Sequence, residues 1–252
     1  MSLILLTNDD GFYSSGIEIL SKKLKKLGQV FVVAPDRERS AISYALTLHR
    51  PLRAEKIRED FYTIDGTPTD CINLAIKKLL PKNPDLIIAG INKGANLGED
   101  TTYSGTVSGA VQGTLFNIPS FAISVIPDKE GIHAFELAAK ITLKIARWVL
   151  NNGLPEETTL NINVPPPPIK GIKMTKLGKK RYNPDIIEKI DPRGRIYYWI
   201  GNGNPQISGD ENTDVRAIEQ GFISITPLRL DLTDYKALVY LTKKDLSSIK
   251  LD

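Results

Sequence analysis

In the first dozen residues a short apolar run is followed at once by an acidic turn. This feature restricts the possible folds more than any other in the sequence. Residues 3–6 are all leucine or isoleucine, and Asn8-Asp9-Asp10-Gly11 follows one residue later. An apolar run of this length, closed by turn residues, is typical of a strand that is buried on both faces. Apolar residues at helical spacing come next, at Ile17, Leu20, Leu24 and Leu27. The chain therefore begins with a strand, an acidic loop and a helix.

Further apolar runs repeat this arrangement. Strands are expected at residues 30–35, 85–90, 120–125 and 160–164. Helices are expected to start near Pro68, Gly105 and Ala134, and strands to fill residues 43–64. Such an alternation predicts an α/β fold with a Rossmann-like, mostly parallel sheet flanked by helices. Ligands of these sheets bind beyond the carboxyl ends of the strands, so the loops at those ends carry the candidate site.

Composition restricts the chemistry and the partners. One cysteine (Cys71) and two histidines (His49, His133) exclude a conventional zinc site, so any metal should be hard and oxygen-ligated, such as magnesium or manganese. No apolar run reaches the roughly 20 residues that span a bilayer, and the start of the chain lacks signal-peptide features. A net charge of +4 is too small to indicate a nucleic-acid partner. We therefore expect a cytoplasmic protein without membrane or stable nucleic-acid partners.

Polar side chains follow three of the expected parallel strands. Asp9 and Asp10 come after the first strand, Ser40 after the second, and Asn92 directly after the third. Adjacent carboxylates repel each other unless a cation lies between them, and two charges with two neutral oxygens suit a hard divalent ion. A turn with a helix N-cap is the competing interpretation of Asp9 and Asp10, and capping is the competing role of Ser40.

A fourth segment, Ser104-Gly105-Thr106, begins a helix beside these loops. The free N–H groups of a helix N-terminus form a ready site for a phosphate. Because this segment joins the converging acidic and amide groups, the pattern predicts a phosphate next to a cation.

The character of the chain changes at four consecutive prolines, 165–168. We expect a Rossmann-like catalytic core at 1–164 and a β-hairpin arm for subunit exchange at 165–210, which contains the aromatic run 196–200. A strand this apolar finds little cover within one protomer. A helix and strand at 211–227 should rejoin the core, and 228–252 should form a tail at a subunit interface. The β-rich arm and tail would thus serve oligomerisation.

Five motifs in a fixed order carry a specific resemblance. They are Leu-Leu-Thr-Asn-Asp-Asp-Gly (5–11), Ala-Pro-Asp-Arg-Glu-Arg-Ser (34–40), Gly-Thr-Pro-Thr-Asp-Cys (66–71), Gly-Ile-Asn-Lys-Gly-Ala-Asn-Leu-Gly (90–98) and Tyr-Ser-Gly-Thr-Val (103–107). With them the chain resembles the survival protein SurE family from residue 1 to about 125, and again at 161–165 and 221–227. That family consists of metal-dependent phosphatases acting on nucleoside 5′-monophosphates. The resemblance implies a 5′-nucleotidase and leaves cleavage of short polyphosphate open.

The resemblance also implies roles for individual residues. It makes Asp9, Asp10, Ser40 and Asn92 the ligands of one divalent cation per subunit. It places Asn96, Ser104, Gly105 and Thr106 against the phosphate of a nucleoside monophosphate. It further implies a homodimer or tetramer with exchanged C-terminal elements. The family usually has glycine after the metal-ligating serine, whereas this chain has Ala41, which bears on the freedom of that loop.

Hydrolysis of a phosphomonoester is the leading interpretation, with Asp9 in a direct catalytic role and either a metal-activated water or an aspartate as the nucleophile. A haloacid-dehalogenase-type phosphatase needs two aspartates separated by one residue, whereas Asp9 and Asp10 are adjacent. A nucleotide-binding module without turnover is the non-enzymatic alternative. A nicotinamide dehydrogenase is disfavoured because no Gly-x-Gly-x-x-Gly follows the first strand.

Overall fold

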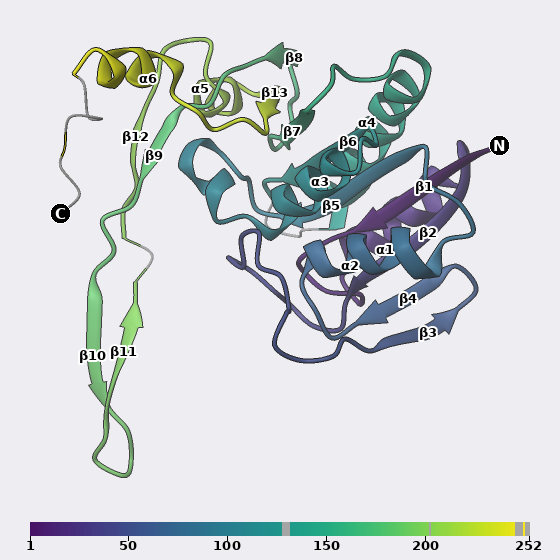
Figure 1. Cartoon of the computed structure of the whole chain (residues 1–252), viewed down its shortest axis with the longest axis horizontal. Coiled ribbons are helices and arrows are strands. Elements are labelled where there is room, and N and C mark those ends of the chain that lie inside the picture. The colour runs from purple at the N-terminus through teal and green to yellow at the C-terminus, as the bar shows by residue number, and fades with distance from the viewer. Residues whose placement is uncertain (128–131, 202, 245–248, 250–252) are drawn as a thin grey trace.

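A nine-stranded sheet forms the centre of the computed structural model, which describes residues 1–127, 132–201, 203–244 and 249 (Figure 1). The strand order is β3-β4-β2-β1-β5-β6-β7-β13-β8. The bounds of these strands are β1 Ser2–Thr7, β2 Gly28–Pro35, β3 Ala54–Arg58, β4 Phe61–Ile64, β5 Leu86–Lys93, β6 Ser120–Val125, β7 Thr158–Val164, β8 Gly171–Met174 and β13 Phe222–Arg229.

Most neighbours in this sheet are parallel, which confirms the predicted α/β class. Strands β4, β2, β1, β5, β6 and β7 run in one direction, while β3 pairs antiparallel with β4 and β13 antiparallel with β7. The order of the chain reverses at β1, because β2 lies on one side of it and β5 on the other. Such a reversal opens a crevice at the carboxyl ends of the strands, where ligands bind in this class of fold.

Helices cover both faces of the sheet (Figure 1). Helices α1 (Ser15–Leu24) and α4 (Ile132–Asn152) pack on one face together with Ile4 and Leu6 of β1. Helix α2 (Pro68–Leu74) packs on the other face together with Leu3 and Leu5. Helix α3 (Gly105–Leu115) contacts β5 and β6 and packs beside α2. Because successive side chains of β1 point to opposite faces, both cores hold its carboxyl end, and hence Asp9, in place.

Shorter helices complete the body, namely η1 (Ala75–Leu79), η2 (Gly98–Thr102), α5 (Asp214–Glu219) and α6 (Tyr235–Thr242). Helix α5 and strand β13 correspond to the helix and strand expected at 211–227. Among the described residues no helix is both long and apolar enough to cross a membrane.

Three expectations about element bounds need correction. Residues 43–53 form no strand, and the expected strands are confined to β3 and β4. Asn92 does not follow the third strand but lies within β5, which continues to Lys93 past an irregularity in its register with β6. Strand β8 belongs to the main sheet, because it pairs parallel with β13. The sheet therefore extends beyond the boundary predicted at residue 164.

The rest of the predicted arm is a long two-stranded extension that leaves the body (Figure 1). Strands β9 (Lys179–Arg181) and β12 (Gln206–Ser208) pair at its base, and β10 (Ile186–Ile190) and β11 (Ile196–Ile200) pair farther out. Every residue of β10 and β11 is exposed, including the aromatic run. Helix α6 has no buried residue, and the remainder of the predicted tail at 245–248 and 250–252 lies outside the described residues.

Candidate active site

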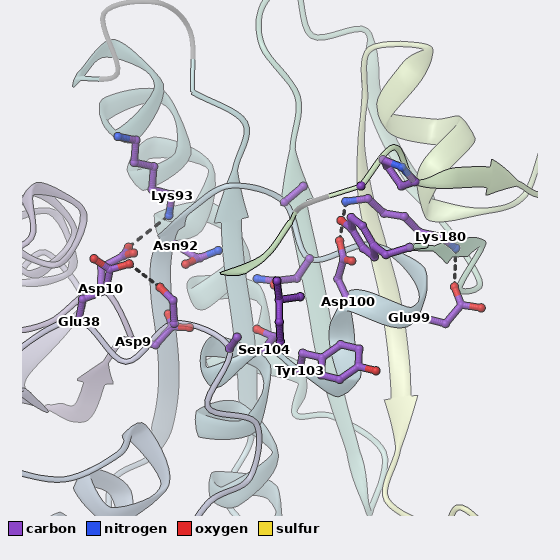
Figure 2. Close-up of a pocket in the computed structure, with 18 of the residues that line it drawn as sticks. Asp9, Asp10, Glu38, Asn92, Lys93, Glu99, Asp100, Tyr103, Ser104 and Lys180 are labelled. Carbon is purple, nitrogen blue, oxygen red and sulfur yellow. Dashed lines mark hydrogen bonds and ion pairs between the residues drawn. The ribbon is translucent and has the colours of Figure 1, made fainter. Parts of the chain in front are cut away.

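The four predicted metal ligands line one cavity at the carboxyl ends of β1, β2 and β5. The cavity has a volume of about 1510 Å³. Asp9, Asp10, Ser40 and Asn92 all contribute to its lining. Figure 2 shows Asp9, Asp10 and Asn92 at one end of the cavity and Lys180 with Asp100 at the other. The structure thus brings together side chains that are more than 80 residues apart in the sequence.

Asp9 is anchored to the start of helix α3. Its side chain is only 4% exposed, and its Oδ2 accepts the N–H of Thr106 at 3.1 Å. The hydroxyl of Thr106 donates to the other oxygen, Oδ1. A Cβ on Gly105 would lie 2.8 Å from the Cβ of Asp9, so only glycine permits this approach. The carboxylate of Asp9 therefore occupies the place at a helix N-terminus that suits an anion.

This contact changes the interpretation of the predicted phosphate site. The N–H of Ser104 donates to the carbonyl oxygen of Asp100, and the N–H of Val107 donates to the Ser104 hydroxyl. Together with the Thr106 bond to Asp9, much of the expected anion site is already satisfied within the protein. Gly105 and Thr106 thus contact Asp9, a partner that the sequence did not indicate. Ser104 itself lines the cavity.

Asp10 and Asp9 share an environment that disfavours their charge. Burial raises the pKa of Asp9, and burial together with the charge of Asp9 raises the pKa of Asp10 to about 6. Glu38 also raises both pKa values, while the Lys93 N–H, 3.2 Å from Oδ2 of Asp10, lowers that of Asp10. A buried and a half-buried carboxylate without enough positive charge nearby are an arrangement that a bound cation would relieve.

Neither aspartate caps the helix that follows it in the chain. The N-cap of α1 is Ser14, which is without a side-chain capping bond. The turn itself is held by Asn8, whose side-chain nitrogen donates to the carbonyl oxygen of Gly11 at 2.9 Å and to Ser14 Oγ at 2.7 Å. Asp9 and Asp10 are therefore left to face the cavity.

The neutral ligands are oriented by neighbours. The amide nitrogen of Asn92 donates to the carbonyl oxygen of Gly94 at 2.8 Å, so its Oδ1 is the atom left to act as a ligand. The Ser40 hydroxyl donates to Glu38 Oε1 at 2.6 Å. This hydrogen bond joins two side chains, so it is not the helix cap that was the competing role of Ser40. Glu38 also lines the cavity, and sequence reasoning missed it although it lies within the 34–40 motif.

The donors present fit a hard divalent cation. Within the described residues no group of three or more histidine, cysteine, aspartate or glutamate side chains could hold a metal ion. The predicted set instead combines two carboxylates with an amide and a hydroxyl oxygen, and all four side chains line one cavity. Oxygen ligands of this kind, with positions left for water and substrate, suit magnesium or manganese.

Asn96 is fixed by a cluster of buried amides. Its N–H donates to Asn163 Oδ1 and its Nδ2 to Ser124 Oγ, both at 2.8 Å. Its carbonyl oxygen accepts from Asn161 at 2.8 Å and from Asn163 at 3.1 Å. Asn161 and Asn163 are fully buried in β7. Two asparagines in a strand buried on both faces are the sequence signal that would have revealed this support.

The far end of the cavity is built by residues that the sequence did not indicate. Lys180, Arg181 and Tyr182 come from the base of the arm, and Glu99 and Asp100 from η2. Lys180 Nζ lies 2.6 Å from Asp100 Oδ2, and the hydrogen bond to Asp100 keeps the pKa of Lys180 raised although burial acts to lower it. Such contacts depend on how the arm folds back, which no local pattern encodes.

Comparison with known proteins assigns the chain to a family. The model of the survival protein SurE family matches residues 4–184. The chain belongs to the survival protein SurE family. It is 52% identical to a protein of Pelobacter propionicus named 5′-nucleotidase SurE, over 95% of this chain and 98% of that relative. A protein of the same name from Geobacter sulfurreducens is 49% identical, over 98% of this chain and 95% of the relative.

A solved structure agrees with the SurE assignment. The crystal structure of the SurE protein from Aquifex aeolicus has a TM-score of 0.84 and 46% sequence identity, covering 96% of this chain and 99% of its own. Agreement over nearly the whole length includes the region of the arm as well as the sheet. The resemblance first seen in five motifs therefore extends to the fold.

Proposed function

We propose that this chain is a cytoplasmic, metal-dependent 5′-nucleotidase that hydrolyses nucleoside 5′-monophosphates to nucleoside and phosphate. The observation that supports the proposal is that Asp9, Asp10, Ser40 and Asn92 line a single cavity. The names of relatives at about half identity support the same activity. A cavity of about 1510 Å³ also has room for a nucleotide, since ligand pockets typically measure about 300–1,000 Å³.

One divalent cation per subunit, magnesium or manganese, would be held by the two carboxylates together with Asn92 Oδ1 and the Ser40 hydroxyl oxygen. When bound, such an ion would neutralise charge on the phosphate and polarise its phosphoryl oxygen. The two aspartates approximately balance the ion's charge. A phosphate dianion can then approach without strong repulsion.

The protein's own groups position the reaction. Asp9 has the direct catalytic role in this proposal, because its carboxylate is held at both oxygens by Thr106 while it still lines the cavity. Ser104 and Asn96 line the cavity nearby and are the proposed contacts of the phosphate. Gly105 and Thr106 act through Asp9. The bond between phosphorus and the ester oxygen breaks, and one water molecule supplies both the new oxygen of the released phosphate and the proton of the nucleoside hydroxyl.

The proposal also covers the quaternary structure, for which the arm in the carboxyl-terminal part of the chain is the relevant element. We assign the hairpin of β10 and β11, together with the tail beyond residue 228, to contacts between subunits of a homodimer or tetramer. The support is the complete exposure of an apolar hairpin, which a lone protomer leaves in water.

Phosphate release from a panel of nucleoside monophosphates tests the activity. We expect release that stops after chelation and returns when magnesium or manganese is restored. Asp9→Asn should abolish it while the circular dichroism spectrum stays that of the wild type. Phosphate release that persists in Asp9→Asn with metal present would remove Asp9 from the mechanism. Nucleotide binding without turnover by the wild type would favour the binding-module alternative.

A further inference from the structure

The cavity has two chemically different ends. At one end lie the carboxylates of Asp9, Asp10 and Glu38, which call for a cation. At the other end the charges cancel, because Lys180 pairs with Asp100 at 2.6 Å and Arg181 with Glu99 at 3.6 Å. A phosphate and its metal belong at the first end. The second end suits an uncharged group.

Ring and apolar surfaces line the neutral end. Tyr103 is 64% exposed, Tyr182 is 42% exposed, and both line the cavity. The arm contributes the rest of this wall, with Pro184 from the segment between β9 and β10, Ile200 from the end of β11, and Gly201, Gly203 and Pro205 from the segment between β11 and β12. Exposed rings beside small and apolar residues offer stacking and contact area to a flat heterocycle. The lining thus matches the nucleoside part of a nucleotide.

The wall is attached to the core along a seam between residues 98–100 of η2 and the arm base at 178–181. A Cβ on Gly98 would lie 2.8 Å from the carbonyl oxygen of Gly178, so the two backbones are in direct contact. Asp214, fully buried, accepts the N–H of Gly98 at 2.9 Å and that of Gly178 at 2.7 Å. Glu99 accepts the N–H of Lys180. The position of the wall therefore depends on this seam.

Of the two ion pairs in the seam that line the cavity, Lys180 with Asp100 is the more buried, because the side chains of Arg181 and Glu99 are 71% and 39% exposed. The side chains of Lys180 and Asp100 are only 16% and 14% exposed. Lys180 Nζ also lies 5.3 Å from the centre of the Tyr182 ring, so the pair holds one of the rings of the wall. Largely buried pairs keep their geometry better than exposed ones, and loss of one partner leaves the other charge uncompensated.

We propose that Lys180 and Asp100 are positioning residues that hold the base of the arm as the wall of a nucleoside subsite. This deepens the proposed 5′-nucleotidase function, on which the identity of the ligand rests. The ion pair fixes Tyr182 and the neighbouring backbone at the end of the cavity opposite the acidic end, where the phosphate lies. Substrate preference is then set by the arm, and the chemistry by the strand ends.

Product inhibition separates the two ends of the cavity. Inorganic phosphate should occupy only the acidic end, and adenosine only the neutral end. In Lys180→Met and in Asp100→Asn, we expect the KM for adenosine monophosphate and the Ki of adenosine to rise about tenfold. The Ki of inorganic phosphate should stay at the wild-type value. Lys180→Arg, which keeps the charge, should restore most of the adenosine affinity.

The chain offers a matched control for this experiment. Lys176 and Asp210 also form an ion pair of 2.6 Å, but their side chains are 62% and 58% exposed and neither lines the cavity. Lys176→Met should leave all three constants unchanged. Equal changes in the constants for adenosine and phosphate, or no change in either, would overturn the proposal.

Titration calorimetry of adenosine into the metal-free protein keeps the outcome interpretable. If the wild type releases no phosphate but binds adenosine, and Lys180→Met weakens that binding, the proposed activity fails while the subsite stands. If the wild type hydrolyses the nucleotide but adenosine binds wild type and Lys180→Met equally, the subsite fails while the activity stands. Thermal melting of every variant shows directly whether it has lost its fold. If a single variant does not fold, the double variant Lys180→Met/Asp100→Asn, which removes both charges of the pair, is measured in its place.

Discussion

At the scale of single residues, the site depends on a carboxylate placed at a helix end. Asp9 receives both the N–H and the hydroxyl of Thr106, and Gly105 supplies the space. These bonds orient the carboxylate and offset part of the free-energy cost of its burial. Thr106 is therefore as much a part of the site as the residues that face the cavity.

Thr106→Val tests this role. The variant keeps the shape of the side chain and the backbone N–H but loses the hydroxyl bond to Asp9. We expect activity to fall by about 10- to 100-fold, the usual cost of removing a group that orients a metal ligand. Thr106→Ser should stay close to wild type in steady-state kinetics. A fully active Thr106→Val would show that the hydroxyl is dispensable.

Asp10 is expected to destabilise the metal-free fold while it serves as a metal ligand. Its folded-state pKa is raised from 3.8 to about 6, so the metal-free fold carries a penalty that is absent below about pH 4, grows as the pH rises to 6, and is complete above that. In Asp10→Asn this penalty disappears. At about pH 7.5 we expect the metal-free variant to be about 1–3 kcal/mol more stable than wild type in urea denaturation. At about pH 4 the two should converge.

The same variant should bind metal more weakly. Titration calorimetry with manganese should show a loss of affinity in Asp10→Asn, because one of the two charged ligands is gone. A variant that is less stable than the metal-free wild type at neutral pH would contradict the penalty assigned to burial of Asp10 and to the charge of Asp9.

Ala41 illustrates what sequence patterns do not reveal at this scale. Its φ is +55°, in the left-handed region that favours glycine. This conformation concerns the loop freedom that the residue after Ser40 was expected to affect. Alanine in this region carries a local cost of about 1 kcal/mol.

At the scale of elements, Asp214 joins three segments. Its buried carboxylate accepts the N–H groups of Gly98, Gly178 and Val215, at 2.9, 2.7 and 2.8 Å. These residues belong to η2, to the arm base and to α5. No local pattern pairs them, because they are separated by up to 116 positions in the chain.

Asp214→Ala should therefore be costly. Three buried N–H groups would lose their acceptor, and we expect the free energy of unfolding to fall by about 3–5 kcal/mol in urea denaturation. Asp210→Ala is the control, because that side chain is 58% exposed, and a change below about 1 kcal/mol is expected. Equal losses of stability in the two variants would show that the three hydrogen bonds of Asp214 do not stabilise the fold.

Apolar runs predicted the elements of the sheet well, because strands buried on both faces must be continuously apolar. The runs at 3–6, 30–35 and 120–125 all became central strands. Asn92 was misplaced because β5 continues past the polar residue at its end. Alternation alone predicts a strand in residues 43–53, but Leu46 and Leu48 are exposed there and pair with no other strand.

The sequence predicted the residues that line the cavity from the ends of the strands. It did not predict the residues that reach the cavity through long-range packing. Asp9, Asp10, Ser40 and Asn92 each follow or end a strand, and a parallel sheet brings such positions together. Lys180 and Tyr182 reach the cavity only because the arm base returns against η2. Contacts of that kind follow from tertiary structure and not from local periodicity.

At the scale of the whole molecule, the hairpin of β10 and β11 is the feature that one protomer does not explain. Ile190 and Ile196 lie opposite each other in register and are 66% and 56% exposed. Ile186, Tyr198 and Ile200 share that face by alternation and are exposed as well. An isolated two-stranded hairpin is only marginally stable in water, so we expect its cover to be a second subunit.

Ile190→Glu/Ile196→Glu tests this expectation. The paired charges would face a desolvated contact, and we expect light scattering after size-exclusion chromatography to show the mass of a single 27.9 kDa chain. Arg195→Glu, a charge change next to the turn of the same hairpin, should keep the wild-type mass. An unchanged oligomer in the double variant would place the subunit contact elsewhere.

The central claim, that four oxygen-bearing side chains hold one cation and present it to a phosphoester, is tested most directly by diffraction. Crystals grown with manganese and inorganic phosphate should give one anomalous peak per subunit, at about 2.0–2.6 Å from oxygens of Asp9, Asp10, Ser40 and Asn92. The phosphate should lie on the ion's open side, next to Ser104 and Asn96. An ordered site without a manganese peak, or a peak away from the two aspartates, would contradict the account.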